Sequence, residues 1–234
     1  CGSHSGSKLH SREAFKILWE YDVDINNLKC PKLNTSPLEH NCSGKHAAFL
    51  ATCKKMNWPL DSYLKGDHPL QVEIFRIISE LLEIPASEIN AERDDCGAPT
   101  LYLKLLEMSK LYSLLSSSEN AELEQISRAI TTNPIMISDN NKFDTEIIKS
   151  SHGQVIGKGG AEGIQCLCKV NEGIGLALKV EDGSKRAKHA VSLHLLKQLE
   201  WISDLRVQDI EEKIFNFSQG VRIEVKGQLK FQES

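Results

Sequence analysis

The sequence has no long apolar run, no excess of one charge and no disulfide-rich pattern. A bilayer-spanning helix needs about 20 consecutive apolar residues, and no segment approaches that length. The formal net charge of -4 provides no electrostatic basis for binding nucleic acid or an anionic membrane. The polar start, CGSHSGSKLH, lacks the apolar stretch of a signal peptide. We therefore expect a cytoplasmic protein with no nucleic-acid partner and no membrane partner.

Seven cysteines are present, an odd number in a chain too long to be a disulfide-stapled miniprotein. We interpret most of them as free thiols in a reducing compartment. The two C-x-x-C pairs of a zinc finger are absent, so cysteine spacing alone indicates no metal site. The length of 234 residues, of which 40% are hydrophobic, suits one large globular domain or two small ones.

The spacing of apolar residues changes from helical to strand-like in the second half of the chain. Helices are predicted over 11–22, 43–57, 68–84, 100–117 and 121–133, with loops at 26–40 and 87–99. Later segments predict one strand each at 154–170 and 173–182, a helix at 184–202 and a terminal hairpin at 221–231. We therefore predict a single α+β domain over 1–234, in which a helical part (about 10–150) packs on an antiparallel sheet with a helix (about 154–234).

The stretch HNCSGKHAAFL, residues 40–50, places reactive side chains where a helix is predicted to begin. If Asn41 or Cys42 caps this helix, Cys42 and Lys45 lie three residues apart on one face. The helix N-terminus and a nearby ammonium both favour a thiolate over a thiol. Cys42 could then be a nucleophile or a metal ligand. A capping turn with a buried cysteine and a solvated lysine is the purely structural interpretation.

Three other stretches carry candidate chemistry. RDDCGAPT (93–100) places two carboxylates beside Cys96 in a turn, which suits either a metal ligand with Asp94 behind it or an ordinary acidic loop. VIGKGGAEG (155–163) has Lys158 at a strand position followed by glycines, which let backbone approach a ligand or form a bulge. CGSHSG at the start suits a tight turn with exposed hydroxyls.

Taken in order, these stretches resemble the zinc-dependent asparaginase family that has a serine β-lactamase-like, penicillin-binding-like fold. The matching motifs are CGSHSG, NCSGKH, DHPLQ (67–71), DDCGAP (94–99), GKGGAEG (157–163) and KVEDG (179–183). The resemblance implies L-asparagine as a small-molecule substrate, Zn²⁺ as cofactor and a homodimer.

The resemblance also implies roles for individual residues. They are Ser3 and Lys158 as a catalytic pair; Cys42, Lys45 and Cys96 as zinc ligands; and Asp94, His46 and Gly159 behind the ligands or beside the substrate. Because two thiolates would share one zinc at ~2.3 Å each, we expect their sulfurs within about 4 Å of one another. In the implied reaction, serine attacks the side-chain amide, lysine accepts its proton, ammonia leaves, and water releases aspartate.

Two differences from the family pattern bear on activity. The family has an S-x-x-K nucleophile segment before the serine turn, and this chain begins at Cys1. We therefore expect the chain alone to be inactive and a separate N-terminal segment to complete it. Asp95 also stands where the family has a glycine, and a left-handed backbone there would be costly.

Three functions are compatible with these observations. The first is an amidohydrolase that converts L-asparagine to L-aspartate and ammonia. The second is a catalytically incomplete homologue that binds zinc and serves a binding or structural role. The third is a penicillin-recognising relative that acts on a peptide or lactam. An S-x-x-K segment encoded upstream would separate the first two. The most informative single measurement is the metal content of the purified protein together with ammonia release from asparagine.

Overall fold

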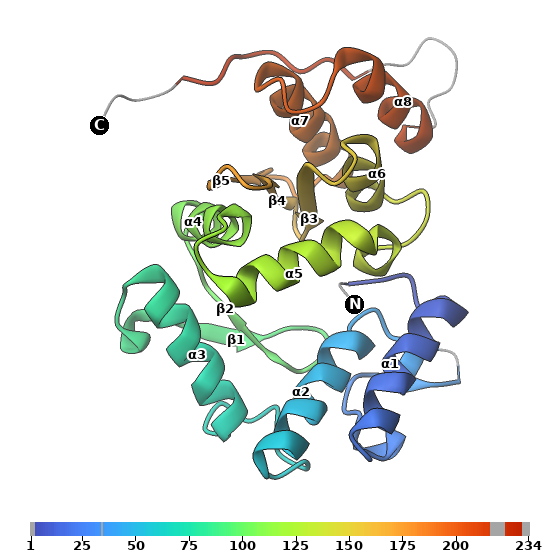
Figure 1. Cartoon of the computed structure of the whole chain (residues 1–234), viewed down its shortest axis with the longest axis vertical. Helices are drawn as coiled ribbons and strands as arrows, with labels where there is room; N and C mark the ends of the chain where they lie inside the picture. The colour runs from blue at the N-terminus through green and yellow to red at the C-terminus, as the bar shows by residue number, and fades with distance from the viewer. Residues whose placement is uncertain (1–2, 34, 216–222, 231–234) are drawn as a thin grey trace. The chain divides into compact units, whose positions relative to one another are not determined.

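The structure, a computed structural model, describes residues 3–33, 35–215 and 223–230 (Figure 1). The chain divides into two compact units: the first comprises Cys1–Lys104 with Met136–Asp139, and the second comprises Leu105–Ile135 with Asn140–Ser234. Each unit combines helices with an antiparallel sheet, which confirms the α+β class. Within the described ranges, no helix is both long and apolar enough to cross a membrane.

The first unit is mainly helical. Its elements are α1 (Lys8–Glu20), α2 (Ser43–Met56), α3 (Pro69–Leu82) and the hairpin of β1 (Ala91–Arg93) and β2 (Pro99–Leu101), with 3-10 turns at Ile25–Asn27, Pro37–Glu39 and Ala86–Glu88. Leu18 of α1 and Leu50 of α2 lie in one core together with Tyr63, and all three are fully buried. Helix α2 ends where Asn57 adopts a left-handed conformation, a common helix terminator. The first turns of α2 are also buried, at Ser43, Gly44, His46 and Ala47, so the start of the helix packs against the core.

The second unit is built around a three-stranded antiparallel sheet. Its elements are α4 (Leu105–Ser116), α5 (Ala121–Thr132), α6 (Phe143–Ser150), β3 (Val155–Gly159), β4 (Ile164–Lys169), β5 (Ile174–Lys179), α7 (Lys185–Gln198) and α8 (Asp204–Ile214), and the 3-10 turn Pro134–Ile137 precedes α6. Strand β4 lies between β3 and β5, and Lys158 of β3 pairs with Cys166 of β4. Helix α4 packs directly on β5, because a Cβ on Gly175 would lie 2.1 Å from the Ser109 carbonyl oxygen.

Several predicted elements agree with the structure and others need correction. Helices predicted over 43–57, 68–84 and 121–133 are present within two residues of the predicted ends. The single strand predicted at 154–170 is wrong, because the chain reverses between β3 and β4. Glu162 and Gly163 both have positive φ there, as a tight hairpin turn requires.

Strand β1 lies in the loop predicted over 87–99, and β2 occupies the start of the helix predicted over 100–117, so that α4 begins only at Leu105. Neither α6 nor α8 was predicted from the sequence. Helix α6 spans only eight residues, so its apolar positions, Phe143, Ile147 and Ile148, give a helical pattern that covers little more than one repeat. Helix α8 does carry such a pattern in Val207 and Ile210.

The terminal hairpin predicted over 221–231 is not formed in its described part, residues 223–230, which contain no strand. His194 and Gln198 of α7 both donate hydrogen bonds to the Gly227 carbonyl, and the Gln198 amide oxygen accepts one from the Leu229 N–H. The segment thus pairs with helix side chains and not with itself. Residues 221, 222 and 231 lie outside the described part of the chain.

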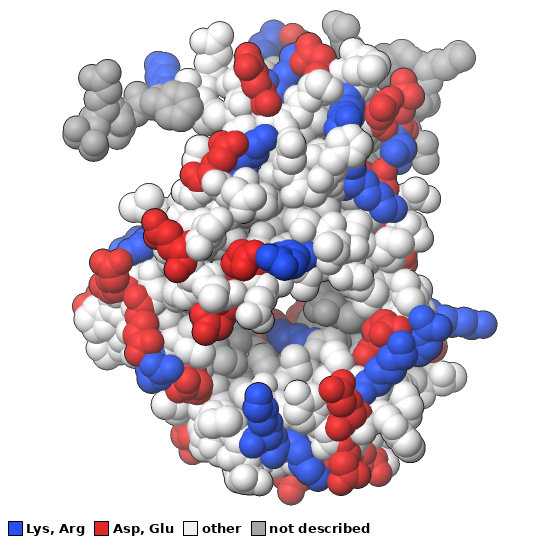
Figure 2. Space-filling model, in the orientation of Figure 1, with Lys and Arg blue, Asp and Glu red and all other residues white. Residues whose placement is uncertain are grey.

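On the face shown in Figure 2, acidic and basic side chains are interspersed. This distribution matches a chain with 28 Lys and Arg against 32 Asp and Glu. Many of the pairs are local, such as Arg76 with Glu73 three residues away on α3. Exposed pairs of this kind contribute little to stability.

One buried histidine should make the second unit sensitive to acid. His189 of α7 stacks on Phe143 of α6, with 4.0 Å between ring centroids. Burial, together with the charges of Lys188 and Lys185, lowers the pKa of His189 from 6.5 to about 4. Between these values the unfolded state binds more protons than the folded state, so stability falls as pH falls through this window.

We expect His189→Phe to reduce this acid sensitivity, because phenylalanine keeps the ring stack and cannot be protonated. The loss of unfolding free energy between about pH 7 and about pH 5 should be smaller than in the wild type by about 1 kcal/mol. Urea unfolding followed by circular dichroism at the two pH values measures it. His152→Gln, at an exposed position, is the control and should retain the wild-type dependence. An unchanged dependence in His189→Phe would contradict this account.

Candidate active site and metal centre

The start of α2 places three of the predicted site residues on one turn of helix. Cys42 is the N-cap residue, and its backbone N–H donates to Nδ1 of His40 at 3.1 Å. Lys45 follows on the same face, whereas His46 points into the core and is fully buried. The expected i, i+3 relation of Cys42 and Lys45 at a helix N-terminus is therefore present.

The turn between β1 and β2 holds the other two predicted residues of the cluster. The Oδ1 atom of Asp94 accepts hydrogen bonds from the N–H groups of Cys96 at 2.9 Å and Ala98 at 3.1 Å. Gly97 carries the positive φ of this turn, at 82°. Asp95 has no positive φ, so the expected cost of placing aspartate where the family has glycine does not arise.

Helix and turn bring Cys42, Lys45, Asp94 and Cys96 together. Nζ of Lys45 lies 2.8 Å from Oδ2 of Asp94. Interaction with the Cys96 thiol lowers the pKa of Cys42 to about 7 in spite of its burial, and Lys45 contributes to the lowering. The same interaction, with burial, raises the pKa of Cys96 to about 12. The two sulfurs therefore share one proton near neutral pH.

The ion pair in this cluster keeps both of its partners charged. Burial opposes ionisation of Asp94, yet hydrogen bonds from Cys96 and Lys45 hold its pKa at about 2. Burial also opposes the ammonium form of Lys45, but the Asp94 carboxylate outweighs it and raises the Lys45 pKa. Without a metal, Lys45 is thus a cation that is paired with Asp94.

His46 lies directly behind Cys96. Its Nδ1 atom is 2.7 Å from the Tyr63 hydroxyl, and that hydroxyl oxygen accepts the Lys29 N–H at 2.9 Å. The Tyr63 proton is then available to Nδ1, which leaves the His46 proton on Nε2. Within the described residues, buried Nε2 has no acceptor of good geometry, although its interaction with Cys96 favours the thiolate. A thiolate at Cys96 would satisfy this buried donor.

The serine turn is attached to the start of α2. The Asn41 side-chain amide donates to Oγ of Ser3 at 2.9 Å, and the Asn41 carbonyl accepts the His4 N–H at 3.1 Å. Nε2 of His4 lies 3.1 Å from the Ser43 hydroxyl. Residues on both sides of Cys42 therefore hold this turn, and Ser3 is bound to the residue that precedes Cys42.

Lys158 and Gly159 belong to the second unit and lie at the end of β3. Nζ of Lys158 donates to the Gly159 carbonyl at 2.6 Å and lies 3.6 Å from Oδ2 of Asp144. The Gly159 N–H donates to the same carboxylate oxygen at 3.0 Å. Ser3 belongs to the first unit and Lys158 to the second. The surroundings of the two members of the predicted catalytic pair are therefore given separately.

Two residues of this site were not predicted from the sequence. Asn41 stands next to Cys42 in the NCSGKH motif, and this adjacency was the available signal. Tyr63 lies in an irregular segment between α2 and α3, and no local pattern associates it with His46.

The donors of the cluster are suited to zinc. Zinc prefers thiolates and accepts nitrogen and carboxylate ligands in a tetrahedral arrangement. Cys42 and Cys96 supply two sulfurs, Lys45 supplies a nitrogen once deprotonated, and the unpaired His46 donor favours a thiolate. Among the described residues, no group of three or more His, Cys, Asp or Glu side chains converges as a ready metal site. The resemblance implies Lys45 as the third ligand, and its ammonium would have to release a proton before the nitrogen could bind a metal.

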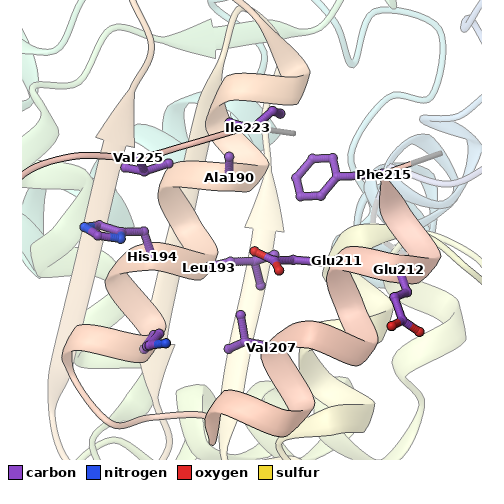
Figure 3. A pocket seen from close by; sticks show the side chains of 10 residues that line it. Ala190, Leu193, His194, Val207, Glu211, Glu212, Phe215, Ile223 and Val225 are labelled. Atoms are coloured by element: carbon purple, nitrogen blue, oxygen red, sulfur yellow. The ribbon is translucent and has the colours of Figure 1, made fainter. Parts of the chain in front are cut away.

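A cavity of about 420 Å³ lies elsewhere, between α7, α8 and the segment that contains Ile223 and Val225 (Figure 3). Its floor includes Ala190, Leu193 and Val207. Its lining includes none of the site residues predicted from the sequence. The cavity therefore gives no support to any of the predicted roles.

The fold and the site together define an α+β protein with a cluster of thiols, an amine and a carboxylate, next to a serine held at the same helix start. The chain belongs to the L-asparaginase II family, whose sequence pattern matches residues 1–231. The resemblance to an asparaginase family is thereby confirmed. Membership associates the chain with a small-molecule substrate and, at the level of the family, with hydrolysis of L-asparagine. No curated protein matches the chain.

Proposed function

We propose that this protein hydrolyses the side-chain amide of L-asparagine, with Ser3 as nucleophile and Lys158 as the base. The observation that carries the proposal is the attachment of Ser3, through Asn41, to the helix start that bears Cys42 and Lys45. The proposed nucleophile is thus hydrogen-bonded to the residue that precedes Cys42, one of the candidate metal ligands. Family membership over residues 1–231 gives independent support for the substrate.

The proposed reaction is acyl transfer in two steps. Ser3 Oγ attacks the amide carbon of the substrate while the neutral amine of Lys158 accepts the hydroxyl proton. The carbon–nitrogen bond then breaks, and the same proton leaves with the amino group as ammonia. Water then gives a proton to Lys158 and attacks the resulting ester; as the bond between the ester carbon and Ser3 Oγ breaks, Lys158 returns that proton to Oγ and aspartate is released. The serine β-lactamase-like relationship inferred from the sequence belongs to this proposal, since that fold also places a lysine on a strand before a glycine.

We further propose that Cys42, Lys45 and Cys96 hold Zn²⁺ beside the substrate. A bound zinc ion supplies a Lewis acid that polarises a nearby carbonyl. Asp94 orients the turn that carries Cys96 through two backbone hydrogen bonds, and the buried Nε2–H of His46 would donate to Cys96 once zinc binding makes it a thiolate. Residues in such supporting positions commonly change metal affinity by about 10- to 100-fold.

The test is to detect the covalent intermediate on Ser3. The protein, alone and with a separate N-terminal segment that carries the S-x-x-K motif, is mixed with L-asparagine, quenched in acid and digested, and the peptide that contains Ser3 is examined by mass spectrometry. We expect this peptide to gain the mass of an aspartyl group, with release of ammonia, when that segment is present, and zinc content is determined in parallel. Zinc binding without ammonia or acylation would instead identify a metal-binding protein without turnover. Acylation at another residue would exclude Ser3 as the nucleophile.

The hydrogen bond from Asn41 should affect the rate more than substrate binding. Its amide donates to Ser3 Oγ, which leaves the serine proton free to point at a base. A neutral hydrogen bond contributes about 1 kcal/mol, so we expect Asn41→Ala to lower kcat about five- to tenfold, with KM nearly unchanged. Steady-state kinetics measure both constants. Asn57→Gly, at the other end of α2, is the control, because glycine adopts the left-handed conformation of this position without strain. A rise in KM alone would show that Asn41 contacts substrate and does not position Ser3.

A further inference from the structure

A buried polar cluster lies against the end of β3 in the second unit. Asp144 of α6, Gln165 of β4 and Lys188 of α7 are at least nine-tenths buried, with exposed fractions of 6%, 0% and 5%. Two helices and one strand, which are separate in the sequence, thus bring a carboxylate, an amide and an ammonium together inside the protein. Burial of charged groups is costly unless they are paired, so the cluster calls for an explanation beyond packing.

The carboxylate is connected to both residues at the end of β3. Oδ1 of Asp144 accepts a hydrogen bond from the Gln165 amide at 2.9 Å. Oδ2 accepts one from the Gly159 N–H at 3.0 Å and lies 3.6 Å from Nζ of Lys158. Asp144 therefore fixes the backbone that follows Lys158 and also forms an ion pair with the Lys158 side chain.

The second lysine holds the turn that follows. Nζ of Lys188 donates to the carbonyls of Gly160 and Ile164, both at 2.9 Å. A Cβ added to Gly159 would lie 2.7 Å from that Nζ and 3.1 Å from Oε1 of Gln165. The glycine after Lys158 is thus required because the buried ammonium and amide occupy the space of a side chain. In the described part of the chain, Gln165 Oε1 has no hydrogen-bond partner.

We propose that Asp144 and Lys188 are positioning residues for Lys158. The Asp144 carboxylate holds the Lys158 amine in place, and the Lys188 ammonium weakens the hold of that amine on its proton. The catalytic consequence rests on the proposed function, in which Lys158 is the base. The electrostatic arrangement itself depends only on the cluster. An adjacent anion favours the ammonium form of a lysine, and an adjacent cation disfavours it.

The other titratable groups that face the cluster are neutral near neutral pH, apart from Lys185. Burial raises the pKa of Cys166, which pairs with Lys158 across β3 and β4, to about 11. Burial also raises the pKa of Tyr112 on α4, and it lowers that of His189 on α7 to about 4. Lys185 is exposed at the start of α7. The charges of Asp144 and Lys188 therefore dominate the environment of Lys158.

The experiment measures the titration of Lys158 directly. Trace acetylation with limiting acetic anhydride, followed by peptide mass spectrometry over a range of pH, gives the titration midpoint of each lysine amine. We expect the Lys158 midpoint to fall by about one pH unit in Asp144→Asn and to rise by a similar amount in Lys188→Met. Lys179, exposed on β5 of the same sheet, is the internal control and should not move.

A double variant guards against loss of folding. Asp144→Asn alone leaves the Lys188 charge buried without its counter-charge, whereas Asp144→Asn with Lys188→Met removes both charges. In the double variant the two shifts should largely cancel, so that the Lys158 midpoint returns toward the wild-type value. Midpoints that stay fixed, or that move in the same direction in both single variants, would overturn the proposal.

The measurement needs no turnover, so its outcome is independent of the proposed function. Opposite shifts with no asparagine hydrolysis would support the electrostatic arrangement and refute the reaction. Opposite shifts with full turnover in Lys158→Met would support the arrangement and remove Lys158 as the base. If the protein is active, the pH at which kcat/KM rises should move in the same direction as the Lys158 midpoint in each variant.

Discussion

Ser3→Ala is expected to lower kcat/KM for L-asparagine by about 10⁴-fold or more, because it removes the proposed nucleophile. Lys158→Met should cause a loss of similar size, since the serine hydroxyl would then have no base. Groups that act as a unit are not additive, so the double variant should be no worse than either single variant. Ammonia release at saturating asparagine, with the metal content matched between samples, measures all three.

The control for this prediction is Ser5→Ala. Ser5 lies in the same turn as Ser3, but its hydroxyl donates to Asp139 and not to a neighbour of the metal cluster. Its replacement should leave kcat/KM within a few-fold of wild type, and melting temperatures should confirm that every variant is folded. Wild-type turnover in Ser3→Ala would remove this serine from the mechanism, and a Lys158→Met enzyme that still works would remove the base.

The candidate metal cluster could be predicted from the sequence because each half of it is local. Cys42 and Lys45 are three residues apart at a helix start, and Asp94 and Cys96 share one turn. Local spacing determines these pairs, and the resemblance to a family joined the two halves. The ion pair between Lys45 and Asp94 then connects the start of α2 to the turn between β1 and β2.

The supporting residues could not be predicted in the same way. Tyr63 reaches His46 across 17 positions of sequence, and Gln165 reaches Asp144 across 21. Contacts of this kind depend on how elements pack, and neither tyrosine nor glutamine stands in a distinctive pattern. Helix α6, which carries Asp144, was not predicted because its eight residues are too few for the helical pattern to stand out from a loop, and the burial of Asp144 depends on how α6 packs in the fold.

The prediction for the metal cluster concerns the affinity of the protein for zinc. We expect the wild type to bind about one zinc ion per chain and Cys42→Ser or Cys96→Ser to lose about 10²-fold or more in affinity, because each removes a thiolate ligand. Competition with a chromophoric chelator measures the affinity, and elemental analysis measures the content. Cys53→Ala, which removes another buried thiol of α2, is the matched control and should bind zinc as the wild type does.

Proton release on zinc binding tests whether Lys45 is the third ligand. Above about pH 7 the two thiols share one proton, and the Lys45 ammonium that is paired with Asp94 carries another, so binding should release about two protons per zinc. Lys45→Met should release about one and should bind zinc more weakly. A pH indicator in weakly buffered solution counts these protons. Equal release by the wild type and Lys45→Met would exclude Lys45 as a ligand and leave it as the counter-ion of Asp94, because only a coordinated amine must lose its proton.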